Sequence, residues 1–253
     1  MNPIAIGTLT FVCTMGGALA GIWLNAVLPE HHLSDESKDT VKVGIGLIAM
    51  MTALVLGLVT ASAKDSFDNI DKEIRHTAAE VLTLDRVLAR YGPETREIRE
   101  MLYHAVERRL EMTWPQKSSQ AAAQDVPDVR DFETAMGLIR GLSPQTDDQR
   151  WLQSRALSLG ETVQEARWLV FTTSVGTSTP APFLFILLFW LTIIFVSFGL
   201  FAPRNAIVIA VLLFCALSVA GAVFLILEMG SPFDGLMKIS PDPLRFALSH
   251  MNQ

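Results

Sequence analysis

The chain has 253 residues, of which 50% are hydrophobic and 18% are charged, and its formal net charge is −6. A soluble domain usually carries about a quarter charged residues, so this composition argues against an ordinary soluble protein. The acidic balance does not indicate the basic surface that nucleic acid requires, and no nucleic-acid partner is expected. Charge is sparse in four apolar windows and dense between the second window and the third.

The four windows predict transmembrane helices, because each holds the roughly 20 residues that cross a bilayer. They cover residues 4–28, 41–63, 182–201 and 206–227. The first is not predicted to be a cleaved signal peptide, because no Lys or Arg precedes Lys38. The predicted fold class is an all-α integral membrane protein with four transmembrane helices and a large helical cytoplasmic domain between spans two and three.

Basic residues near the span ends predict the orientation, because cytoplasmic loops carry the excess of Lys and Arg. One side holds Lys64, Lys72, Arg75, Arg167, Lys238 and Arg245, and the other holds only Lys38, Lys42 and Arg204. The first side is expected to be cytoplasmic and to contain both termini. The predicted organisation is spans one and two with an external loop in 1–63, the cytoplasmic domain in 64–181, spans three and four in 182–228, and a cytoplasmic tail in 229–253.

The loop between the first two spans concentrates acidic and histidine side chains. These are Glu30, His31, His32, Asp35, Glu36 and Asp39. Such a cluster can bind a divalent metal, titrate near neutral pH, or concentrate cations at the mouth of a pore. The alternative is a solvated loop in which Ser34 or Asp35 caps span two. Lys42, at the outer end of span two, either reaches the membrane interface or meets ions at the mouth.

Spans one and two each carry a stripe of small residues, which lets helix backbones approach closely in a bilayer. The stripe positions predicted to pack are Gly17, Gly21, Gly46, Ala49, Ala53 and Gly57. The alternative is that one stripe faces a conduction path. The other face of span two carries Leu47, Met51, Leu54 and Leu58, which would form an apolar constriction if this span lines a pore.

The segment after span two is predicted to be helical throughout. A heptad seam runs from Phe67 to Tyr91 and ends at Gly92-Pro93, and no breaker separates it from span two, so both are expected to form one rod. A second helix over 94–113 is expected to share one face among Ile98, Met101, Ala105 and Met112. The stretch 116–128 is polar and is predicted to be a flexible loop.

Two further helices are predicted before span three. The first carries Phe132, Met136 and Ile139, and the second has a seam from Leu152 to Val170. Gly141, Ser143 and Pro144 predict a stop, an N-cap and a first-turn proline between them. In the tail, Ser240 is expected to cap a short helix before Leu244 and Phe246.

The sequence contains none of the nucleotide-binding or metalloprotease motifs that mark common catalytic sites. We therefore predict that the protein is not an enzyme, has no catalytic residues, and uses no cofactor or resident metal.

Three stretches together resemble a mostly bacterial family of four-span proteins described as a bestrophin-like domain. They are LPEHHLSDESKDTVKVGIGLIAMMTALVLGL, the following SAKDSFD, and PFDGLMKISPDPL near the C-terminus. The resemblance covers nearly the whole chain and is strongest at residues 28–68 and 228–248. It implies an ion channel related to bestrophins, which are pentameric, have four spans per subunit and line their neck with span two.

The resemblance therefore predicts a homo-oligomer, with a pentamer favoured, that passes inorganic ions across the inner membrane of a bacterium. It suggests the face of Leu47, Met51, Leu54 and Leu58 as the pore lining. Bestrophin necks include aromatic residues, which span two lacks, and the external loop is acidic, so the sign of the selected ion stays open. The alternative function is a non-conducting scaffold or sensor whose helical seams bind a partner.

Overall fold

The computed structural model describes residues 2–27, 35–114, 128–176, 181–203 and 205–252, with backbone alone at 35–38, 128–130, 167–176 and 181. The described chain is helical. Its elements are α1 (Pro3–Val27), α2 (Asp35–Tyr91), the short helix η2 (Pro93–Thr95), α3 (Arg96–Thr113), α4 (Asp128–Gly141), α5 (Asp147–Gly176), α6 (Ala181–Phe201), α7 (Ala206–Met229) and α8 (Asp242–His250).

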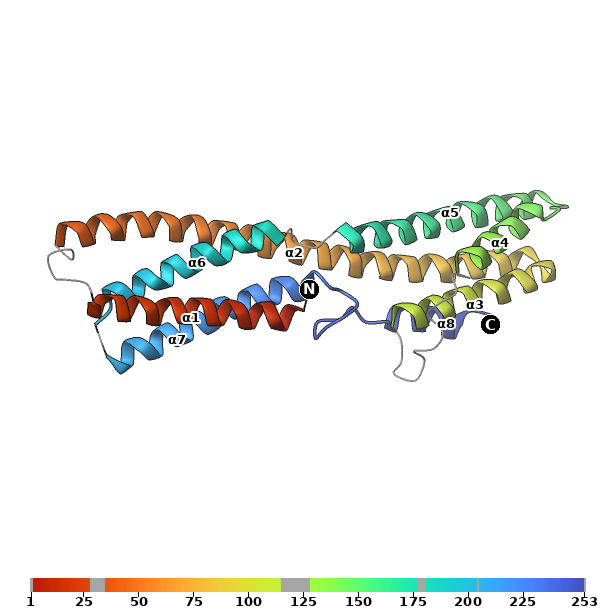
Figure 1. Ribbon diagram of the computed structural model, residues 1–253. Coiled ribbons are helices and arrows are strands. Elements are labelled where there is room, and N and C mark those ends of the chain that lie inside the picture. The colour runs from red at the N-terminus through yellow and green to blue at the C-terminus, as the bar shows by residue number, and fades with distance from the viewer. Residues whose placement is uncertain (1, 28–34, 115–127, 177–180, 204, 253) are drawn as a thin grey trace. The chain divides into compact units, whose positions relative to one another are not determined.

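The chain forms two compact units, and α2 contributes to both. The first unit is Met1–Phe67 with Thr177–Ser231, and the second is Asp68–Gly176 with Pro232–Gln253. All four helices that are long and apolar enough to cross a membrane have their apolar windows in the first unit. As the absence of a breaker predicts, α2 runs without interruption from span two into the seam, and Figure 1 shows it as one continuous ribbon.

In the first unit α1, α6 and α7 pack against one another (Figure 1). Ala18, Phe195, Leu212 and Ala216 form a buried core between these three helices. Gly21 has no side chain to separate α1 from α6, and a Cβ placed there would overlap the backbone oxygen of Val196. Close backbone approach is how helices associate where lipid supplies no hydrophobic drive.

In the second unit the predicted seam of α2 is buried. Ile70, Ile74, Val81, Leu84 and Leu88 are each at most 6% exposed. These residues recur at helical spacing and therefore lie on one side of α2. These five seam residues therefore pack within the protomer.

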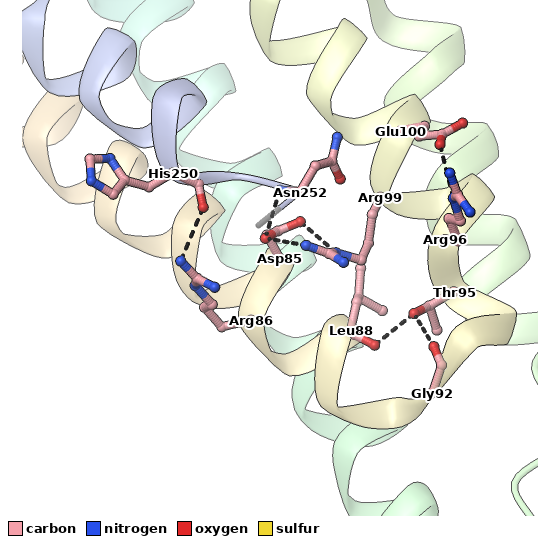
Figure 2. Close-up of polar contacts among 10 residues, drawn as sticks. All are labelled: Asp85, Arg86, Leu88, Gly92, Thr95, Arg96, Arg99, Glu100, His250 and Asn252. Carbon is pink, nitrogen blue, oxygen red and sulfur yellow. Dashed lines mark hydrogen bonds and ion pairs between the residues drawn. The ribbon is translucent and has the colours of Figure 1, made fainter.

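The corner between α2 and α3 is closed by a glycine and a buried threonine. Gly92 has φ 146, a conformation that side chains disfavour, and it ends α2. The hydroxyl of Thr95 donates to the carbonyl oxygens of Leu88 at 2.6 Å and of Gly92 at 2.9 Å. Figure 2 shows these contacts at the turn.

A buried ion pair crosses from α2 to α3 (Figure 2). The carboxylate of Asp85 is fully buried and accepts from Arg99 Nε at 2.8 Å and from Nη2 at 2.9 Å. The hydrogen bond that Arg99 donates to Asp85 raises the pKa of the Arg99 guanidinium. The C-terminal segment also contacts this site. The backbone amide of Asn252 donates to Asp85 Oδ2 at 3.3 Å, and Arg86 Nη2 donates to the backbone carbonyl of His250 at 3.1 Å.

In the second unit one local prediction is wrong and another is confirmed only in part. Ser143 does not cap α5, which begins four residues later; Thr146 Oγ1 instead accepts from the Gln149 amide at 3.1 Å. On α3 the buried residues are Ile98, Leu102, Ala105 and Val106, and Met112 is exposed. Met112 lies in the last turn of α3, next to its C-terminus at Thr113.

The predicted short helix carrying Phe132, Met136 and Ile139 is confirmed as α4, and these three residues are buried. In the tail, Ser240 Oγ accepts from the Asp242 amide at 3.1 Å at the start of α8. Leu244 is buried there, whereas Phe246 is exposed. The predicted flexible loop at 116–128 lies almost entirely outside the described residues.

Candidate functional site

The apolar half of α2 is the candidate site, and its sequence forms an uninterrupted helix. It contains glycines but no proline between Val41 and Ala63, so no backbone donor is removed. The hydroxyls of Thr52 and Thr60 donate back to Ile48 and Leu56 carbonyls, both at 2.7 Å. These polar groups are thereby satisfied within the helix, as a bilayer requires.

One side of this half of α2 packs against its own protomer. Leu56 contacts a buried cluster formed by Leu187 and Leu191 of α6 and Val223 of α7. Thr52, one turn earlier, is also buried. This side therefore faces the other helices of the first unit.

The opposite side carries the four residues predicted to line a pore. Leu47 is 62% exposed, Met51 48%, Leu54 65% and Leu58 63%. Leu47 and Leu56 are nine residues apart, which at about 100° per residue places them on opposite sides of the helix. The four apolar side chains consequently point away from the helices of their own protomer.

Among the four candidate spans, α2 is the one least covered by the protomer. Only 6% of its most apolar window is buried, compared with 33% for α1 and α6 and 22% for α7. A long, contiguous exposed apolar surface marks a site of contact with lipid or with another protein. Most of the surface of this part of α2 is therefore available to contact lipid or a neighbouring subunit, or to line a pore.

The N-terminal end of α2 carries the described part of the predicted acidic mouth. Asp39 and Lys42 are exposed, and Lys42 Nζ lies 3.4 Å from Asp39 Oδ1. Glu30, His31 and His32 lie outside the described residues, and the side chain of Asp35 is not described. The structure therefore brings together only the pair Asp39 and Lys42, and the mouth stays a prediction.

The small-residue positions fall into two groups. On α1, a Cβ at Gly17 would come within 3.2 Å of Thr192 on α6, and Gly21 lies still closer to that helix. On α2, a Cβ at Gly46 or Gly57 would meet no described atom within 4 Å, and Ala53 is exposed. Close helix packing of the α2 stripe (Gly46, Ala49, Ala53 and Gly57) would therefore need a partner from outside this protomer.

Sequence reasoning missed a hollow between α2 and α6. It has a volume of about 460 Å³ and includes Lys42, Gly46 and Ala49 of α2 and Phe198 and Phe201 of α6. No pattern in the sequence indicates it, because the space depends on how two helices distant along the chain are placed. Gly46 and Ala49 leave room beside α2 because their side chains are small, but they do not show which helix lies opposite.

The chain matches the family model of the bestrophin-like domain over residues 12–244. No curated protein sequence matches the chain.

Solved structures with the same fold come from Klebsiella pneumoniae. A tryptophan-to-alanine variant of a bacterial bestrophin homologue superposes with a TM-score of 0.69 and 15% identity, covering 99% of this chain and 97% of that one. A tyrosine-to-alanine variant gives 0.65 and 14%, covering 98% and 99%. A structure phased with zinc gives 0.63 and 14%, covering 96% of both chains. At these identities the similarity establishes the fold alone.

Proposed function

The chain belongs to the family of the bestrophin-like domain, and on that premise we propose that it forms an oligomeric ion channel whose pore is lined by α2. The pore face comprises Leu47, Met51, Leu54 and Leu58. The observation that carries the proposal is that these four side chains point away from their own protomer, while Leu56 on the opposite side packs into it.

Several subunits are needed to build such a pore. Ala18, Phe195, Leu212 and Ala216 form an apolar core between α1, α6 and α7, so the proposed pore is not placed between these three helices. A ring of subunits would instead bring several copies of the exposed α2 face together around an axis. Apolar rings of this kind gate conduction by dewetting. The resemblance to bestrophins favours five subunits.

The proposed setting is the bacterial inner membrane, with both termini and the helical domain between spans two and three in the cytoplasm. Asp39 and Lys42 would then lie toward the external mouth. Their opposite charges support neither anion nor cation selectivity.

Current through single channels tests conduction and the role of α2 together. Purified protein is reconstituted into planar bilayers under asymmetric salt, with Met51→Glu beside the wild type. We expect wild-type currents, and we expect Met51→Glu to change the conductance and shift the reversal potential toward cation selectivity, because each subunit adds a carboxylate to the pore.

Ala53→Glu is the matched control, since Ala53 is also exposed, lies two residues from Met51, and points about 100° or more away from each pore-face residue around the helix. Its currents are expected to keep the wild-type selectivity. Wild-type protein that stays silent under changes of voltage, pH and divalent ions would contradict conduction. A strictly monomeric protein on crosslinking in native membranes would contradict the assembly.

A further inference from the structure

The hollow between α2 and α6 is an apolar groove at the membrane end where α2 begins and α6 ends. Ile45, Gly46, Ala49, Phe198 and Phe201 supply its apolar lining. Its volume is about 460 Å³. Because a Cβ at Gly46 would meet no described atom within 4 Å, the groove is open beside this glycine.

The groove has charged groups at its outer end. Lys42 lines it, and Asp39 lies one helical turn closer to the start of α2, 3.4 Å from the Lys42 ammonium. Both side chains are more than half exposed. An exposed pair of this kind contributes about 1 kcal/mol or less, so it can readily be exchanged for contacts with a ligand.

We propose that this groove binds a zwitterionic phospholipid of the bilayer, with one acyl chain against the aromatic and small side chains. The lipid phosphate would meet the Lys42 ammonium, and the headgroup ammonium would meet the Asp39 carboxylate. This inference requires only that these helices lie in a bilayer, and it does not depend on conduction.

The order of the charges favours a zwitterionic lipid such as phosphatidylethanolamine. In its headgroup the phosphate lies nearer the hydrocarbon core and the ammonium lies further out. Lys42 lies deeper along the span than Asp39, so each charge faces its opposite. An anionic lipid such as phosphatidylglycerol would meet Lys42 through its phosphate, but its neutral glycerol headgroup has no ammonium group to meet Asp39.

The position of the groove favours lipid over a neighbouring subunit as its occupant. Lys42, Ile45 and Ala49 lie on the same side of α2 as Leu56, which packs against the protomer's own helices. This side is nearly opposite to the pore face of Leu47, Met51, Leu54 and Leu58. A lipid chain can enter such a gap between two helices of one protomer, whereas the pore face lies on the other side of α2 and would surround the channel axis.

Lipid titration followed by native mass spectrometry tests the proposal. Delipidated full-length protein in detergent is titrated with phosphatidylethanolamine and, separately, with phosphatidylglycerol. We expect one saturable site per subunit that prefers phosphatidylethanolamine. Gly46→Leu fills the groove and is expected to weaken that site at least tenfold. Lys42→Gln and Asp39→Asn are each expected to weaken it and to reduce the headgroup preference.

Gly57→Leu is the matched control, because it makes the same change on the same helix at an open position outside the groove. It is expected to bind phosphatidylethanolamine like the wild type, and melting temperatures establish that each variant is folded. Equal binding of the two lipids would overturn the headgroup assignment. Unchanged phosphatidylethanolamine binding by Gly46→Leu would overturn the site. A Gly46→Leu variant that loses its oligomers but still binds this lipid would overturn it as well.

Discussion

Asp85 is the residue on which the contacts between α2, α3 and the C-terminal segment converge. Its carboxylate has no solvent exposure, accepts two hydrogen bonds from Arg99, and accepts a third from the backbone amide of Asn252. A buried charge is tolerated only where it is paired and hydrogen-bonded. Asp85 therefore specifies how the end of the chain is held against α2 within the second unit.

Asp85→Ala is expected to lower the free energy of unfolding by about 3–5 kcal/mol, because it leaves the nearly buried Arg99 guanidinium without its partner. Thermal unfolding of the full chain in detergent, followed by circular dichroism, measures the loss. The double variant Asp85→Leu/Arg99→Met removes both charges and is expected to recover much of it. A single variant as stable as the wild type would contradict this role.

Glu80 gives the second unit a pH dependence. Burial raises the pKa of its carboxyl group, against the opposing effect of His76 at 3.4 Å. The protonated acid is thus favoured in the folded state, so its contribution to stability is complete below the ordinary pKa of 4.5 and is lost as pH rises through the raised value.

Glu80→Gln removes the titration and is expected to melt at a higher temperature than the wild type at pH 7, with the difference vanishing near pH 4. Melting curves across this range measure the effect. Glu161→Gln, at an exposed position on α5, is the control and is expected to follow the wild type. A wild-type advantage over Glu80→Gln at pH 7 would contradict the burial argument.

At the scale of elements, the contact between α1 and α6 depends on the glycines of α1. Gly21→Ala places a methyl group against the Val196 carbonyl, and we expect a loss of about 1–3 kcal/mol from overpacking. Gly16→Ala is the control on the same helix, because a Cβ there would meet no described atom within 4 Å. The melting temperatures of the two variants are measured in detergent. Equal melting temperatures would contradict the close contact between α1 and α6 at Gly21.

Apolar length and helical periodicity predicted the helices well. The continuous α2 followed from the lack of a breaker before Gly92, and the buried seam followed from its spacing. The pairing of Asp85 with Arg99 could not be predicted, because Asp85 resembles an ordinary surface charge until α3 turns back at Thr95. The hollow beside Gly46 was missed for a similar reason, since Phe198 and Phe201 come from a helix about 150 residues later.

At the scale of the whole molecule, α2 is the element that both units share. Its first half belongs to the unit with the candidate spans, and its second half belongs to the unit that holds the Asp85 cluster and the C-terminal segment. The helix that is proposed to line the pore thus continues into the unit that holds Asp85.

Accessibility of introduced cysteines along α2 shows whether this helix lines a conducting pore. Single cysteines replace Leu47, Met51, Leu54, Leu58 and, as the control on the opposite side, Leu56, in a background where Cys13 and Cys215 are serine. A charged thiol reagent is then added during planar-bilayer recording. We expect current to change at the four pore-face positions and to stay constant at Leu56. A response at Leu56 alone, or at none of the five while the wild type conducts, would contradict a pore lined by this face of α2.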